Sequence, residues 1–179
     1  IACGQTQLII PGDYASTIGS TGDVAPLGAT NQHMQQEYAA SLLTSSGLVA
    51  GDQITAIGFR VADGDPSLAA QTVSDYSIWM GVGAFSPGHL SSTFADNGSG
   101  MALVRSGALT ISSGQFAGGT GPNPFGMIQL AAPYTYAGGD LLIEISYSGF
   151  VNGVTVDTVY PYANSLAETA FGTGSGATK

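Results

Sequence analysis

Short runs in which apolar and polar residues alternate are the feature that most limits the fold of this chain. They recur between Gly, Pro, Asp and Asn residues, whereas helical periodicity is nearly absent. Such alternation is typical of strands that bury one face and expose the other. The strand-like runs are 5–10, 53–62, 75–83, 101–112, 124–131, 140–148 and 153–162. In 75–83, one face would carry Tyr76, Ile78, Met80 and Val82, and the opposite face Asp75, Ser77 and Trp79.

Eight or more short strands at this spacing predict an all-β protein with an antiparallel β-sandwich or jelly-roll-like fold. We expect residues 1–172 to form a single β-sandwich domain, followed by a flexible Gly, Ser and Thr tail at 173–179. The polar segment 11–33 is expected to be a long loop or an assembly arm. Residues 34–43 fit either a strand or a helical turn, since their pattern does not decide.

The charge of the chain argues against two classes of partner. Arg60, Arg105 and Lys179 are its only fixed cations, against 12 acids, which gives a formal net charge of -9. Nucleic acids and anionic membrane surfaces are both bound by clustered Lys and Arg, so we expect neither partner. No run of 18 apolar residues occurs, and membrane insertion is not expected. Cys3 is the single cysteine, which leaves only a disulfide between chains open.

The residue inventory offers little for catalysis. A Gly-x-Ser-x-Gly elbow is lacking, and the two histidines, His33 and His89, fall in loop-like segments. A glycan-active enzyme would need two carboxylates across a cleft, with Glu144 as one of them and Asp75, Asp157 or Glu37 as the other. Alternation instead places Glu144 opposite the core face of its strand, where a cross-strand pair with Arg60 would account for it. We therefore predict a protein that is not an enzyme, with a glycan-active enzyme as the remote alternative.

The sequence predicts no cofactor, although calcium stays open. One Cys and two His are too few for the usual zinc sites. Asp63, Asp65 and Asp96 are candidate calcium ligands, because hard cations take oxygen ligands from loops. The same residues are common in turns, and no EF-hand spacing is present. The turn interpretation is preferred.

Four segments in a fixed order carry a family resemblance: NQHMQQEYAASLL, ITAIGFRV, DYSIWMG and PFGMIQLAAPYTYAGGDLLIEISY. Together they resemble a domain of secreted bacterial surface proteins that carry PEP-CTERM or type IX sorting tails. The resemblance spans residues 31–148. It implies an extracellular β-sandwich and brings no catalytic set with it.

The resemblance and the composition together predict a non-catalytic structural or adhesive subunit of a bacterial cell surface or matrix. Low charge with many Gly, Ser and Thr residues is common in self-associating surface proteins. We expect a homo-oligomer or filament in which the N-terminal strand adds to the sheet edge of a neighbour. The residues expected to assemble are Thr6, Gln7, Leu8, Ile9 and Ile10.

The alternative is a carbohydrate-binding module with a surface polysaccharide as its partner. Sugar rings stack on exposed aromatic side chains, and the candidates are Trp79, Tyr160 and Tyr162. A position in the core or in an assembly interface would explain the same rings. The exposure of these three side chains therefore decides between the two interpretations.

Overall fold

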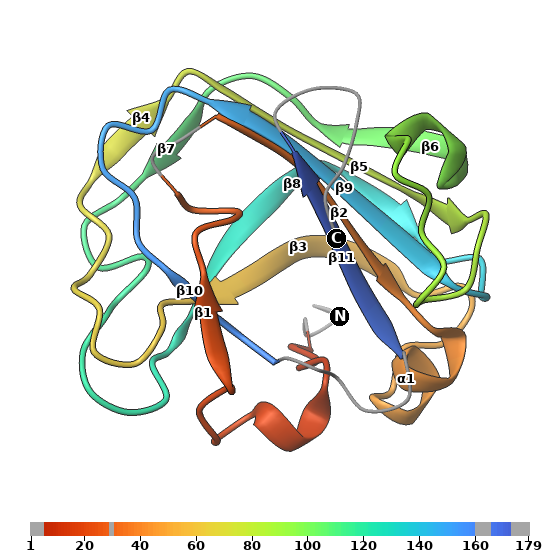
Figure 1. Cartoon of the computed structure of the whole chain (residues 1–179), viewed down its shortest axis with the longest axis horizontal. Coiled ribbons are helices and arrows are strands. Elements are labelled where there is room, and N and C mark those ends of the chain that lie inside the picture. The colour runs from red at the N-terminus through yellow and green to blue at the C-terminus, as the bar shows by residue number, and fades with distance from the viewer. Residues whose placement is uncertain (1–5, 29–30, 160–165, 173–179) are drawn as a thin grey trace, which may run out of the picture.

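The computed structural model describes residues 6–28, 31–159 and 166–172 and confirms the all-β prediction (Figure 1). The strands are β1 (Thr21–Asp23), β2 (Gln32–Tyr38), β3 (Gln53–Arg60), β4 (Gln71–Val73), β5 (Asp75–Gly83), β6 (Gly98–Arg105), β7 (Leu109–Ile111), β8 (Phe125–Thr135), β9 (Leu141–Ser148), β10 (Val156–Thr158) and β11 (Ala167–Gly172). One short helix, α1 (Ala40–Ser45), and two 3-10 turns, η1 (Gly12–Tyr14) and η2 (Phe94–Asp96), complete the described part. Among the described residues, no helix is long and apolar enough to cross a membrane.

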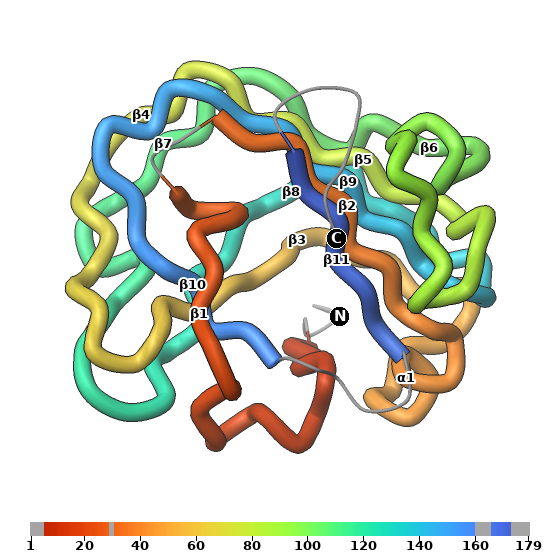
Figure 2. The backbone as a smooth tube through the Cα atoms, in the orientation of Figure 1, coloured from red at the N-terminus to blue at the C-terminus, as the bar shows by residue number. Residues whose placement is uncertain are grey.

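A five-stranded antiparallel sheet organises the fold, in the order β11-β2-β9-β5-β6. The two-stranded sheet β3-β8 packs over one face of it, and this face is called the inner face below. Two smaller pairs, β1-β10 and β4-β7, extend the structure, and Figure 2 shows β1 (red) running beside β10 (blue). The arrangement is sandwich-like, as the alternating runs predict.

The core between the two layers follows the predicted alternation. Tyr76, Ile78 and Met80 of β5 are fully buried and contact the same apolar cluster as Ile128 of β8. Val82 departs from the prediction, because its side chain is 40% exposed. It lies near the end of β5 and belongs to none of the apolar clusters of the core.

Several expected element boundaries were wrong. Residues 6–10 form no strand in the described chain, although a first strand was expected there. The segment 11–33 is more ordered than a long loop, since it contains η1 and β1 and the start of β2. Residues 34–43 are both a strand and a helix, with β2 ending at Tyr38 and α1 beginning at Ala40. The predicted tail at 173–179 lies outside the described residues.

Arg60 fixes the segment before β1, and the predicted pair between Arg60 and Glu144 is wrong. Arg60 is 4% exposed, and its Nε donates to Oδ2 of Asp157 at 2.6 Å. Its other nitrogens donate to the carbonyl oxygens of Tyr14, at 2.9 Å, and of Thr17. Arg60 and Glu144 are not neighbours because β3 pairs with β8, whereas β9 lies between β2 and β5.

The outer face of the five-stranded sheet, opposite β3-β8, is covered over only part of its length. The connection 84–97 folds over one end, where Leu90 and Phe94 pack on Leu142 and Ala170. At this end the sheet has apolar contacts on both faces. Towards Asp75, at the start of β5, the outer face instead carries polar side chains. This polar part of the outer face is the candidate site.

Candidate functional site

Outward-facing residues of three strands form rows across the outer face, from its polar part to the covered end. Residues that pair across antiparallel strands present their side chains on the same face, so each row is a set of neighbours. The rows, from β5 through β9 to β2, are Ser77–Ser146–His33, Trp79–Glu144–Gln35 and Gly81–Leu142–Glu37. Asp75 pairs with Ser148 one row further along.

A chain of hydrogen bonds holds Glu144 in place. Its Oε1 lies 2.8 Å from Nε2 of His33, and its Oε2 accepts a hydrogen bond from Nε2 of Gln35 at 2.6 Å. Gln35 in turn accepts from Nδ2 of Asn97 at 2.8 Å and donates to the carbonyl oxygen of Phe94 at 3.0 Å. Gln35 and Asn97 are fully buried. Buried, satisfied partners of this kind fix the orientation of the side chains above them.

The same contacts set the charge of Glu144. Burial opposes its ionisation, but the hydrogen bonds from His33 and Gln35 outweigh this effect, and the pKa of Glu144 lies below its ordinary value. A general acid near neutral pH needs a raised pKa instead. The environment of Glu144 therefore suits a fixed acceptor better than a proton donor.

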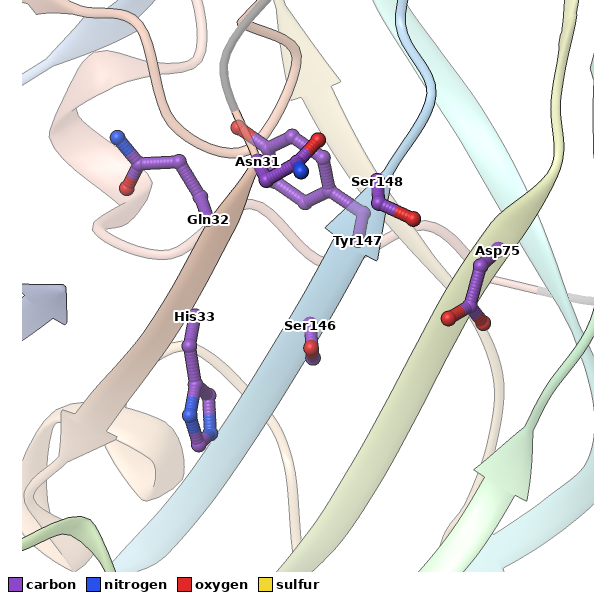
Figure 3. A pocket seen from close by; sticks show the side chains of 7 residues that line it. All are labelled: Asn31, Gln32, His33, Asp75, Ser146, Tyr147 and Ser148. Carbon is purple, nitrogen blue, oxygen red and sulfur yellow. The ribbon is translucent and has the colours of Figure 1, made fainter. Parts of the chain in front are cut away.

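A pocket of about 270 Å³ opens beside the His33–Glu144 pair (Figure 3). In Figure 3, Ser146 of β9 lies between His33 of β2 and Asp75 of β5, with Ser148 at the end of β9. Asn31, Gln32 and Tyr147 complete the lining. Small hydroxyl side chains at the centre and larger polar ones at the sides give the sheet face a shallow trough.

Trp79 stands in the row next to the trough, beside Glu144. Its side chain is half-buried, and on its other side it pairs with the exposed Leu103 of β6. Part of the indole is thus open to solvent on the polar side of β5, as alternation predicts. The other two rings considered for stacking, Tyr160 and Tyr162, lie outside the described residues, as does Cys3.

The three candidate calcium ligands make contacts that belong to turns. Asp63 accepts from the backbone N–H of Gly121 at 2.6 Å, and Asp65 from that of Thr155 at 2.8 Å. Asp96 lies in η2, with its Oδ2 3.3 Å from the hydroxyl of Ser91. Within the described ranges, no three His, Cys, Asp or Glu side chains are grouped so as to hold a metal ion. Calcium binding by these residues remains untested.

Glu37, one of the candidates for a second carboxylate, lies in the third row, in surroundings that the sequence did not reveal. It is 0% exposed, and neither carboxylate oxygen has a hydrogen-bond partner among the described atoms. Its carboxylate lies against the backbone of Gly83 in β5. Burial, followed by the negative charges of Asp140 and Glu168, raises its pKa to about 7. Glu37 therefore titrates near neutral pH inside the covered end of the outer face.

Sequence reasoning missed the strand β2 as a source of site residues. His33 was assigned to a loop, and Gln35 was not considered. The signal is nevertheless present in QHMQQEY. His33, Gln35 and Glu37 stand at every second position, and Met34 and Tyr38 fall on the opposite face of the strand.

Comparison with models of protein families, with curated proteins and with solved structures gave no match to this chain. The fold and the outer face define an all-β protein with a polar, partly covered sheet face. The resemblance to domains of secreted bacterial surface proteins stays a prediction.

Proposed function

We propose that the protein is a non-catalytic structural or adhesive subunit of an extracellular bacterial assembly. Copies of the chain would join through residues 6–10, which would add to the edge of a neighbour's sheet. The fold class, the low charge and the Gly-rich composition support a structural role. The observation that carries the proposal is that residues 6–10 form no strand within the described chain.

Leu8, Ile9 and Ile10 are apolar, yet residues 6–10 form no strand within the described chain. Leu8 is 37% exposed and lies next to Gly47, just after α1. Ile10 contacts the cluster around Leu43 and Leu48 and anchors the segment at that end. An extended apolar segment with no strand partner is suited to pairing with another chain, because backbone hydrogen bonds supply the affinity.

The five-stranded sheet offers one edge for such pairing. At one side β6 lies beside β8, and Arg105 of β6 donates to the carbonyl oxygen of Gln129 at 3.4 Å. At the other side β11 pairs with β2 and has no second neighbour among the described strands. A strand with a neighbour on one side only is a template for a further strand, so β11 is the acceptor that we propose.

Replacing Leu8 with aspartate is expected to raise the protein concentration needed for self-association at least about tenfold, since it places a charge in the proposed contact. The measurement is light scattering after size-exclusion chromatography over a range of concentrations, together with electron microscopy of the native protein. Leu8 is partly exposed, so the fold of this variant should persist.

Val151→Asp is the matched control, because Val151 is also an exposed apolar residue but lies far along the chain, between β9 and β10. It should assemble as the unchanged protein does. A protein that stays monomeric at every concentration would refute the proposal, and so would a Leu8→Asp variant that assembles normally.

A further inference from the structure

We propose that the trough on the outer face of the five-stranded sheet binds a neutral polysaccharide, with Trp79 as the stacking surface and Asp75 and Glu144 as hydroxyl acceptors. This site is separate from residues 6–10 and does not depend on the proposed assembly. It uses residues of β2, β5 and β9, which are central strands rather than edges.

Hydrogen bonds within the protein already hold the Glu144 side chain beside the trough. Glu144 is oriented by His33 and Gln35, and Gln35 is itself held by the buried Asn97. Buried amide groups are costly to place in a protein unless their hydrogen bonds are satisfied, and here they support a carboxylate that is about 20% exposed. A prepared acceptor loses little freedom when a ligand binds, which favours affinity.

The chemistry of the lining selects for hydroxyl groups. Ser146, Ser148 and Asp75 line the pocket, and Glu144 lies beside it, bonded to the lining residue His33. The serine hydroxyls can donate and accept, whereas the two carboxylates accept strong hydrogen bonds from hydroxyl donors. No Lys or Arg occurs among the described residues that line the pocket, and the whole chain carries a formal charge of -9. Acidic polysaccharides should therefore be repelled, and neutral ones accepted.

The shape of the face fits an extended sugar chain. Two small side chains, Ser77 and Ser146, are neighbours in one row, and the half-buried Trp79 lies in the next row. A sugar ring could lie over the serines with its apolar face against the indole, because aromatic rings combine a broad apolar surface with a polar edge.

Native affinity electrophoresis of the full chain tests the site with named probes. The neutral probes are hydroxyethylcellulose, xylan, dextran and galactomannan, and the acidic probe is alginate. We expect at least one neutral polysaccharide to retard the protein and alginate to leave its mobility unchanged. A matching short oligosaccharide, titrated by calorimetry, then separates recognition of single sugar units from recognition of the polymer.

Trp79→Ala should weaken the retarding interaction at least tenfold, as expected for the loss of one central aromatic contact. Ser77→Ala combined with Ser146→Ala removes only two hydroxyl groups from the sheet face and should also weaken binding, by several-fold, without unfolding the protein. Val49→Ala changes an exposed apolar residue between α1 and β3, outside the strands that carry the trough, and should bind as the unchanged chain does. Near-ultraviolet circular dichroism checks that each variant is folded.

Two results would overturn the site. One is a folded protein that none of the four neutral polysaccharides retards. The other is binding that persists unchanged in both the Trp79 variant and the double serine variant, since the ligand would then lie elsewhere.

Discussion

Replacing Arg60 with alanine is expected to lower the free energy of unfolding by roughly 3–5 kcal/mol, the usual effect of removing one partner from a buried ion pair. Asp157 would remain buried without its cation, and the carbonyl oxygens of Tyr14 and Thr17 would lose their donors. The guanidinium also lies 5.1 Å from the ring centre of Phe125, a contact that disappears with it. The measurement is urea denaturation of both proteins.

The other arginine of the chain provides the control. Arg105 is less buried, and it donates to carbonyl oxygens without an ion pair among the described contacts. Arg105→Ala should cost about 1 kcal/mol or less. In Arg60→Ala, amide hydrogens of residues 14–20 should also exchange faster, because this side chain fixes that segment. If the two variants lose the same free energy of unfolding, the Arg60–Asp157 pair stabilises the protein no more than the hydrogen bonds of Arg105 do.

Glu37→Gln is expected to remove a pH dependence of stability that the unchanged protein has between pH 4.5 and about 7. In the folded protein the pKa of Glu37 is raised, so the folded chain binds this proton more tightly than the unfolded chain does. The stabilisation is complete below pH 4.5 and is lost as the pH rises through about 7. At pH 8 the loss from this one carboxyl group should be roughly 3 kcal/mol.

The glutamine variant keeps the size of the side chain and cannot ionise. Its stability, measured by urea denaturation at pH 4.5, 6 and 8, should fall less than that of the unchanged protein as the pH increases. Asp13→Asn, which removes an exposed acid in η1, should leave the pH dependence as it was. The free energies of unfolding of Glu37→Gln and of the unchanged protein should not change with pH in parallel. If they do, Glu37 is not the group that causes the pH dependence.

The alternation of apolar and polar residues along each strand predicted much of the inner face of the sheet. Two-residue alternation correctly placed Tyr76, Ile78 and Met80 in the core, since the period of a strand is a local property. The run 101–112 contains β7 and most of β6, and Gly107 between the two strands has a φ of 91°, which favours glycine. Such signals depend only on neighbours in sequence.

The partners of the charged groups could not be predicted in this way. Arg60 pairs with Asp157, 97 residues away, because β10 follows β9 and returns beside β1 and the end of β3. Alternation correctly placed Glu144 on the outer face, but its partner is His33, in a segment that the sequence predicts as a loop and that forms part of β2. Both pairs depend on the order of strands in space, which alternation alone does not determine.

Trp79 is the only tryptophan of the chain, and it stands on the polar outer face beside the trough. The indole emission of the entire protein therefore comes from this one surface. A sugar that covers the ring should move the emission to shorter wavelength, whereas pairing of residues 6–10 with β11 should leave it in place. The protein thus carries an intrinsic optical probe that distinguishes ligand binding from self-association without any added label.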